Sequence, residues 1–342
     1  PSYGPCAYVH SPARRAGHTP RESSADEPEG ILIVTESKKH DCVLCGSCVV
    51  DILVRPVPLE SAIGGGQLLQ TDPIGVTTGG VVSNSGIALA RLGMRVAAFS
   101  YVGDDQWSSV IRDRYADEGI DTSRLLTHPT GATSTTAVLI DPSGERSFAH
   151  CVCAPKQMDK KMFLENLDLF AASRMTLIGY YSLMPNLERD LAEVLAAIRE
   201  TGCQTALDAA GEGGTMQPLE QCLPQLDVYF PSRAEATHQT GKEDPQQIIV
   251  TFRDCGAPGL LGVKLGADGA LLSPAAGQFE RIQQVVPPGR VLDTRGAGDC
   301  FYAGLIAGLL RGYPPVDAGR LAAATGACCV TGLGANAGLR DF

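Results

Sequence analysis

The chain has 342 residues, of which 44% are hydrophobic and 19% charged, and its formal net charge is −10 at pH 7. This length suffices for one large α/β domain or two smaller ones, with a sizeable core. The acidic balance, without any block of Lys and Arg, disfavours nucleic acid as a partner, because neutralising phosphates needs a basic face. No apolar run in the sequence approaches the ~18–20 residues that a membrane span needs, so we expect no membrane partner either.

Twelve cysteines are spread along the chain, most of them within apolar runs. A free cysteine in such a run behaves as a small buried hydrophobic residue. Disulfide frameworks are typical of small secreted chains, whereas this chain is large and its first residues do not read as a signal peptide. We therefore expect a protein of the reducing cytoplasm.

Residues 41–52 read DCVLCGSCVVDI. Cys42, Cys45 and Cys48 in this stretch have the C-x2-C-x2-C spacing with which some iron–sulfur runs begin. Such a run continues with a fourth cysteine and a proline, but Ile and Leu occupy those positions here. Residues 43–52 also form a near-continuous apolar run, which predicts one strand buried on both faces, along which Cys45 and Cys48 point to opposite sides. We interpret the cysteines as strand packing that leads to Asp51.

Residues 1–30 differ from the rest of the chain, being rich in Pro, Ser, Gly and charged residues without a periodicity of 2 or 3.6. This composition predicts a disordered or loosely attached extension. From residue 31 onward, strand patterns alternate with helix patterns. The alternation predicts one α/β domain over residues 31–342, with a mainly parallel sheet covered by helices.

Apolar residues at helical spacing predict three helices in the first 202 residues. A buried helix is expected over residues 81–93, and a strand follows over 96–103. A second helix ends at Gly119. The third helix is expected over residues 186–202, with Asn186 as its N-cap.

Short apolar runs predict four further strands, at 204–208, 227–230, 261–265 and 270–273. The last long helix is expected from Gly298 to Arg311. The alternation of strands and helices is interrupted at residues 137–150, which read as a hairpin turning on Pro142–Gly144. It is also interrupted at residues 52–58 and 68–78, because no helix joins these two segments. We therefore expect these segments to form a small separate β-sheet.

The stretch with the clearest chemistry is LDTRGAGDCFYAGL, residues 292–305. Gly296, Ala297 and Gly298 leave the backbone uncrowded where a helix begins, so their N–H groups can point at one anion. Asp299 follows in the first helical turn, where a carboxylate beside an anion hole can take a proton from a hydroxyl. From the residues alone, an ordinary Gly-rich helix start with an acidic first turn is an equal alternative.

A second motif is GGVVSNSGIALARLG, residues 79–93. Gly79 and Gly80 predict a tight turn before the helix. Asn84 stands near the helix start, where it either caps the helix or reaches a ligand, and the residues alone favour capping.

Together the two motifs resemble those of the ribokinase-like (PfkB-type) carbohydrate kinases, over about residues 41–340. DTRGAGD resembles the family's C-terminal signature, and GG-x3-N-x6-RLG followed by VGDD resembles the N-terminal one. The resemblance implies a three-layer ribokinase-like α/β fold, with a mainly parallel central sheet flanked by helices and a small β-sheet lid. The lid would come from about residues 52–60, 68–78 and 133–150.

The resemblance also implies ATP-dependent phosphorylation of a hydroxyl on a small-molecule sugar or sugar derivative. Asp299 matches the family's general base, and Gly296, Ala297 and Gly298 match the anion hole for the transferring phosphoryl group. The positions that match the family's sugar-binding residues are Asp51, Gly79, Gly80 and Asn84.

Two further elements of the family concern ATP and Mg²⁺. The nucleotide-binding T-x-G-x-x-G element falls on Lys264, Gly266 and Gly269, with lysine in place of threonine. Lys264 either lies beside the ATP phosphates or is a solvated strand end. Glu235 matches an acid that acts on magnesium-bound water, although Ser232 replaces the usual Asn. The alternative for Glu235 is an acidic residue favoured by the helix dipole.

Members of the family often bind a monovalent cation, K⁺, near the anion hole. Asp293 matches its side-chain ligand, and the carbonyl ligands would come from about residues 329–334. Arg295 stands where a small or apolar residue is usual; it either reaches a phosphate or forms an ion pair elsewhere.

Other functions remain open. A nucleoside kinase of the same fold would stack a base on aromatic lid residues, and only Phe148 stands out on the hairpin, which favours a sugar. A non-catalytic sugar-binding protein is disfavoured by the intact Asp299 and anion hole. Tyr180 and Tyr181 either shape the sugar pocket or pack in the core. Exposed lid edges would allow a homodimer, and the sequence does not identify the sugar.

Overall fold

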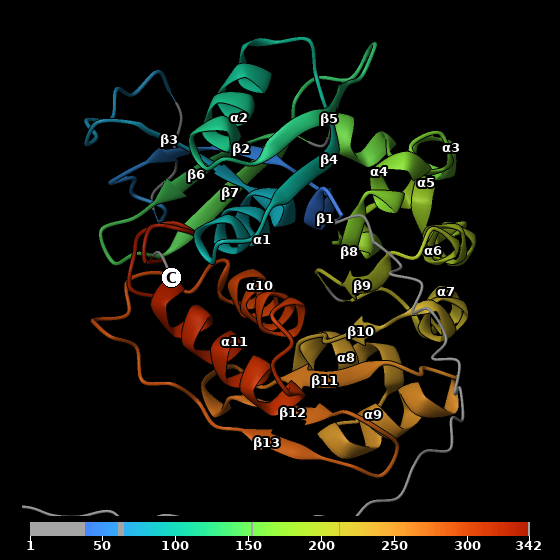
Figure 1. Ribbon diagram of the computed structural model, residues 1–342. Coiled ribbons are helices and arrows are strands. Elements are labelled where there is room, and N and C mark those ends of the chain that lie inside the picture. The colour runs from blue at the N-terminus through green and yellow to red at the C-terminus, as the bar shows by residue number, and fades with distance from the viewer. Residues whose placement is uncertain (1–37, 61–64, 152, 212, 341–342) are drawn as a thin grey trace, which may run out of the picture. The chain divides into compact units, whose positions relative to one another are not determined.

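The computed structural model describes residues 38–60, 65–151, 153–211 and 213–340. The extension predicted for residues 1–30 lies outside the described residues. The described residues form a mixed α/β unit that begins at Lys38 and contains a nine-stranded and a four-stranded sheet (Figure 1). Within these ranges, every helix is too short or too polar to cross a bilayer.

The large sheet has the strand order β13-β12-β11-β10-β9-β8-β1-β4-β5. From β5 to β11 in this order, each strand is parallel to its neighbour. The β11–β12 and β12–β13 pairs are antiparallel. In such a sheet, ligands bind beyond the carboxyl ends of the parallel strands. The strands are β1 (His40–Gly46), β4 (Val96–Val102), β5 (Asp121–Thr127), β8 (Ser173–Gly179), β9 (Gln204–Asp208), β10 (Val228–Tyr229), β11 (Leu260–Lys264), β12 (Ala270–Ser273) and β13 (Glu280–Ile282).

The small sheet has the order β3-β2-β6-β7. Its strands are β2 (Val49–Val54), β3 (Gly75–Gly79), β6 (Thr135–Ile140) and β7 (Arg146–Cys151). Strands β6 and β7 pair antiparallel, with Val138 opposite Phe148. The predicted hairpin and the predicted separate β-sheet are therefore confirmed.

Helices cover both faces of the large sheet (Figure 1). In β1, Cys42 and Leu44 join one core cluster, whereas Val43 and Cys45 join the other, so the sheet lies between two helical layers. The three-layer fold implied by the resemblance is confirmed. The first layer holds α1 (Gly80–Arg91), α2 (Gln106–Asp117), α10 (Ala297–Leu310) and α11 (Pro315–Cys329). The second holds α3 (Lys160–Leu164), α4 (Leu167–Ala171), α5 (Pro185–Glu188), α6 (Leu191–Glu200), α7 (Met216–Cys222), α8 (Arg233–Thr240) and α9 (Pro245–Asp254).

The prediction of one strand through residues 43–52 is wrong. Gly46, with a φ of 133°, ends β1, and the chain starts β2 at Val49 in the other sheet. Asp51 therefore lies within a strand of the small sheet rather than at the end of the first strand. A continuous apolar run does not reveal such a change of sheet, because both strands are buried where they meet.

The three cysteines of this stretch are buried, and their thiols have different partners. Cys45 Sγ lies 3.4 Å from Thr176 Oγ1, and Cys48 Sγ donates to Ser100 Oγ at 3.4 Å. Burial raises the pKa of the Cys48 thiol to about 11, which keeps it protonated. Over the described ranges, no three His, Cys, Asp or Glu side chains gather as a metal site would require.

Two helix predictions need correction. Residues 186–202 form two helices, and Asn186 lies inside α5 instead of capping a longer helix. Helix α11 was not predicted, because many of its residues are Ala or Gly and they form no stripe of large apolar side chains. It lies alongside α10 (Figure 1), and the contact is close enough that a Cβ on Gly304 would lie 2.6 Å from Thr325 Oγ1.

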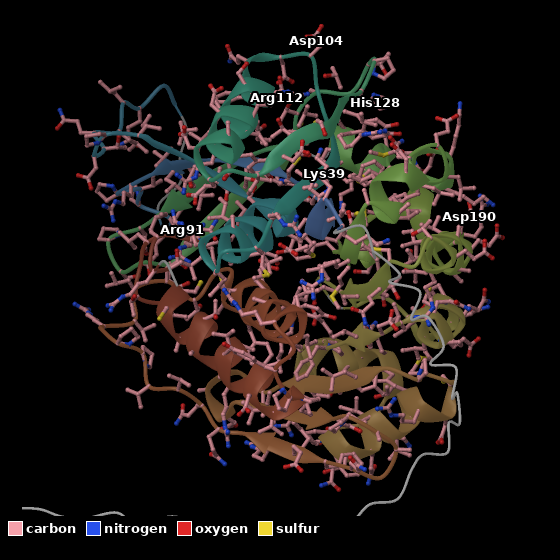
Figure 2. The ribbon with its side chains drawn as sticks, in the orientation of Figure 1. Lys39, Arg91, Asp104, Arg112, His128 and Asp190 are labelled. Atoms are coloured by element: carbon pink, nitrogen blue, oxygen red, sulfur yellow. The ribbon has the colours of Figure 1, made fainter. Side chains whose placement is uncertain are left out.

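Arg91, labelled in Figure 2, fixes the end of α1. Its Nε and Nη2 donate to the two carboxylate oxygens of Glu118 at 3.0 and 2.7 Å, and its Nη1 donates to the carbonyl of Asn336 at 3.0 Å. Three segments that are distant in the sequence are thereby held together around the helix that carries Asn84.

Candidate active site

A cavity of about 950 Å³ lies between the small sheet, the start of α10 and the segments that follow β8, β9 and β11. A second cavity, of about 580 Å³, shares Lys264, Gly266 and Gly298 with the first, so the two adjoin. The predicted site residues on the first wall are Asp51, Gly80, Glu235, Lys264, Gly266, Gly296, Gly298 and Asp299. Those on the second wall include Gly269 and Ala297. Gly79, Asn84 and Asp293 line neither cavity.

Asp299 lies buried in the first turn of α10. Its Oδ2 accepts hydrogen bonds from Asn84 Nδ2 at 2.7 Å and from the Tyr180 hydroxyl at 2.8 Å. Burial raises the pKa of Asp299, and these two hydrogen bonds oppose the rise. Asn84 makes no capping bond in α1, so its side chain reaches across to Asp299 rather than capping its own helix.

Tyr180 follows β8 with a left-handed backbone, at φ 60° and ψ 38°. Among the described residues it is the one non-glycine residue with positive φ. Such a conformation costs on the order of 1–3 kcal/mol and is frequent at functional sites. Tyr181 differs from it, because its hydroxyl donates to the carbonyl of Gly213 at 3.0 Å within the core.

The start of α10 is shaped to receive an anion. Gly296 precedes the helix with a φ of 71°, and a Cβ there would lie 2.5 Å from the Cβ of Ala335, so only glycine fits. The first N–H groups of a helix have no partner within it. Because the N–H of Ala297 donates to the carbonyl of Thr294 at 3.3 Å, Gly298 and Asp299 are the better donors to an anion.

Lys264, at the end of β11, is a largely buried cation beside this helix start. Its Nζ lies 3.1 Å from Asp208 Oδ1 and 5.5 Å from the centroid of the Tyr302 ring. A Cβ on Gly298 would lie 3.6 Å from the same Nζ. Burial lowers the pKa of Lys264, but the carboxylates of Asp208 and Glu235 outweigh this and raise it. Its side chain is 12% exposed, so the solvated strand end considered above does not occur.

Asp51 approaches the turn at the start of α1. A Cβ on Gly79 would lie 2.6 Å from Asp51 Oδ2, so glycine leaves room for the carboxylate. Thr136 is its register partner on β6, and the Thr136 hydroxyl lies 2.9 Å from His150 Nδ1. Burial raises the pKa of Asp51, and the charge of Arg295 opposes the rise.

Glu235 forms a capping box at the start of α8. Its Oε2 accepts from the Ser232 N–H at 2.6 Å, and the Glu235 N–H donates to Ser232 Oγ at 3.3 Å. Glu235 also lines the cavity together with Asp208, and the two carboxylates are close enough for Glu235 to raise the pKa of Asp208, after the larger effect of burial. Mg²⁺ prefers such carboxylate oxygens together with water and phosphate, so this donor set suits it.

The carboxylate of Asp293 is 0% exposed and receives donors on both oxygens. Oδ1 accepts from Arg146 Nη1 at 3.0 Å and from Arg295 N at 3.0 Å and Nε at 3.2 Å. Oδ2 accepts from Arg295 Nε at 3.1 Å and Nη2 at 2.8 Å, and from the Gly334 N–H at 2.9 Å. Arg295 thus forms an ion pair with the residue two positions before it.

Sequence reasoning missed three residues of this site: Asp208, Arg146 and the role of Tyr180 as a partner of Asp299. Tyr180, Asp208 and Lys264 each stand at or directly beyond the carboxyl end of a parallel strand. Polar residues at such strand ends are a signal that could have identified Asp208. Arg146 gives no comparable signal, because its partner is 147 positions away in the sequence.

The sequence profile described as pfkB family carbohydrate kinase matches residues 39–341. The chain belongs to this family. As a pfkB-family kinase it is a phosphotransferase that acts on an alcohol group of a sugar or nucleoside, and the resemblance seen in its two motifs is confirmed.

Several relatives span most of this pfkB-family chain. A fructokinase of Klebsiella pneumoniae is 29% identical over 77% of this chain and 82% of its own length. A ribokinase of Haemophilus influenzae is 27% identical over 80% of this chain and 88% of its own. The structure of Arabidopsis thaliana ribokinase complexed with ribose and ATP aligns with a TM-score of 0.75 and 21% identity, covering 88% of this chain and 96% of that one. The structural likeness establishes the common fold.

Proposed function

We propose that this kinase transfers the γ-phosphoryl group of ATP to a hydroxyl of a sugar or sugar derivative, with Asp299 as the general base. The observation that carries the proposal is the placement of Asp299, a buried carboxylate on the cavity wall in the first turn of α10. A general base must stand within hydrogen-bond reach of the proton that it takes. Asn84 and Tyr180 hold Oδ2, which leaves Oδ1 for the acceptor hydroxyl. The fructokinase and ribokinase relatives support a sugar as acceptor.

The acceptor binds on the side of the cavity where the small sheet meets α1. Asp51 accepts hydrogen bonds from sugar hydroxyls there, and Gly79 and Gly80 bring the backbone close. The small sheet and the segments that adjoin it, over residues 52–60, 68–78 and 133–150, act as a lid that keeps water from the reacting groups.

ATP binds along the second cavity, with its phosphates at the shared wall. Lys264 and the N–H groups at Gly298 stabilise the charge of the transferring phosphoryl group, in the manner of an oxyanion hole. Gly266 and Gly269 let the backbone approach the nucleotide. Glu235, through water, and Asp208 would hold Mg²⁺, which neutralises phosphate charge when it is bound.

A turnover screen tests the proposal. ATP consumption would be followed with Mg²⁺ against sugars, sugar acids and nucleosides, and Asp299→Asn would be compared with the wild type on each acceptor that responds. We expect one sugar or sugar derivative to respond, and the variant to lose ~10²–10⁴-fold in turnover while it still binds the acceptor. A response to nucleosides alone would overturn the sugar assignment, and unchanged turnover in the variant would overturn the assignment of the base.

A further inference from the structure

The place where members of this family often hold a monovalent cation does not fit one here. The expected side-chain ligand, Asp293, has both carboxylate oxygens occupied by N–H donors from Arg295, Arg146 and Gly334. A carboxylate offers about four lone-pair sites, and five N–H-bearing atoms at distances between 2.8 and 3.2 Å surround this one. No lone pair is left to ligate a metal ion.

The charge balance leads to the same conclusion. The carboxylate of Asp293 forms ion pairs with the guanidinium groups of Arg295, at 2.8 Å, and of Arg146, at 3.0 Å. Two guanidinium groups already neutralise this single negative charge. Any further cation at the carboxylate would stand at contact distance from both of them and would be repelled.

Two of the carbonyl groups expected to complete the cation site, those of Cys329 and Val330, have hydrogen-bond partners within the chain. Val330 O accepts from the N–H groups of Leu292 at 2.8 Å and Asp293 at 3.3 Å. Cys329 O accepts from the N–H of Gly332 at 3.3 Å. The thiol of Cys329 also donates to two neighbouring carbonyl groups, Arg295 O at 3.5 Å and Ala335 O at 3.1 Å. These carbonyl oxygens are therefore already engaged in hydrogen bonds within the chain.

We infer that Arg295 supplies from within the chain the positive charge that a monovalent cation provides in other members, so that this kinase works without K⁺. The guanidinium lies in the loop that leads directly into Gly296 and the start of α10, and it lines the same cavity as Asp299. Arg146 extends the ion pair to β7, and so it ties the hairpin of the small sheet to the anion-binding loop. Arg295 is thus a positioning residue for this loop.

Salt replacement tests the inference. Wild type would be compared in potassium, sodium and tetramethylammonium chloride at one ionic strength, by turnover and by melting temperature. We expect turnover to agree within about twofold, and the melting temperature within about one degree, in the three salts. A rise of either quantity that is specific to K⁺ would overturn the inference.

Removal of the guanidinium supplies the second arm. Arg295→Ala should lose at least tenfold in turnover in tetramethylammonium and regain part of it in K⁺, with a K⁺-specific rise in melting temperature. Arg290→Ala, at an exposed arginine a few residues earlier, is the matched control and should behave as wild type. A loss in Arg295→Ala that K⁺ does not relieve would overturn the substitution of guanidinium for cation. If this variant does not fold, Arg295→Lys, which keeps the charge, replaces it. Its turnover and melting temperature should not depend on K⁺, and a K⁺-specific rise in either would count against the inference.

The turnover arm rests on the proposed function, but the melting arm needs no acceptor. A protein that phosphorylates none of the acceptors would refute the proposed function, and its melting temperatures in the three salts would still decide whether a cation binds.

Discussion

The hydroxyl of Tyr180 donates a 2.8 Å hydrogen bond to the same carboxylate oxygen of Asp299 that Asn84 contacts. Both donors favour the ionised form of a carboxylate that burial pushes toward the neutral form. The left-handed backbone of Tyr180 directs its ring to this place, at the carboxyl end of β8. We therefore regard Tyr180 as a positioning residue for the proposed base.

Tyr180→Phe removes one donor and keeps the ring. Because the lost hydrogen bond lowers the pKa of Asp299, the variant should have a higher pKa there, and activity that needs the ionised base should disappear at a higher pH. A hydrogen bond to a charged group contributes about 1.5–3 kcal/mol, so the acidic limb of kcat/KM should shift by about one pH unit or more. The measurement is the profile of kcat/KM against pH for wild type and variant.

Tyr181→Phe is the matched control, because it removes the neighbouring hydroxyl, which donates to Gly213 in the core. It should lower the melting temperature and leave the acidic limb in place. Equal shifts of the acidic limb in both variants, or none in Tyr180→Phe, would contradict the role assigned to Tyr180.

Lys264→Met tests the largely buried cation at the helix start. The variant keeps a chain of similar length but removes the charge beside Gly298, where the proposed phosphoryl group lies. Removal of one donor of this kind costs about 10²–10³ in turnover. We expect such a loss, together with weaker binding of ATP and unchanged binding of adenosine, measured by calorimetry. Equal weakening of both ligands would point to a general collapse of the site instead.

The variant also leaves Asp208 without its ion-pair partner. Lys264→Met combined with Asp208→Asn should restore much of the melting temperature, since the unpaired buried carboxylate is gone. Turnover should remain low in the double variant. Its recovery would show that Lys264 serves only to balance Asp208.

Glu235→Gln separates the two roles of that side chain. Glutamine can still accept the Ser232 N–H, as in a capping box, so helix α8 and the melting temperature should be preserved. If the charge of Glu235 acts on magnesium-bound water, the Mg²⁺ concentration for half-maximal turnover should rise several-fold. A magnesium titration that coincides with that of wild type would leave capping as the sole role of Glu235.

The parts of the site that sequence could predict are those encoded in one contiguous stretch. Gly296, Gly298 and Asp299 belong to one helix start, and local spacing fixes their relation. Asn84 shows the limit, because capping and reaching a ligand look the same in sequence. Its actual partner is 215 positions away. Only the packing of α1 against α10 settles which role it has.

The fold was predictable because the pattern of each helix or strand is also encoded in one contiguous stretch. The errors in predicting it have local causes. Alternation of strand and helix patterns predicted a mainly parallel sheet covered by helices, and the family resemblance implied its three layers. The turn at Gly46 could not be recognised, because it lies within one apolar run whose two halves belong to different sheets. The ion pair of Arg295 with Asp293 was an open alternative. Its completion by Arg146 required the hairpin to be placed in space.

Gly298→Ala provides a test in which stability and activity should move in opposite directions. A Cβ on Gly298 would lie 3.6 Å from Lys264 Nζ, an ordinary contact, so the fold can accept it. Alanine is about 1 kcal/mol better than glycine in a helix, so the melting temperature should stay equal or rise. The methyl group would occupy space that the proposed phosphoryl group needs, and turnover should fall at least tenfold. Gly296→Ala is the contrast: a Cβ there would lie 2.5 Å from the Cβ of Ala335, so both stability and turnover should fall. Full turnover in Gly298→Ala would mean that the anion binds elsewhere than at the start of α10.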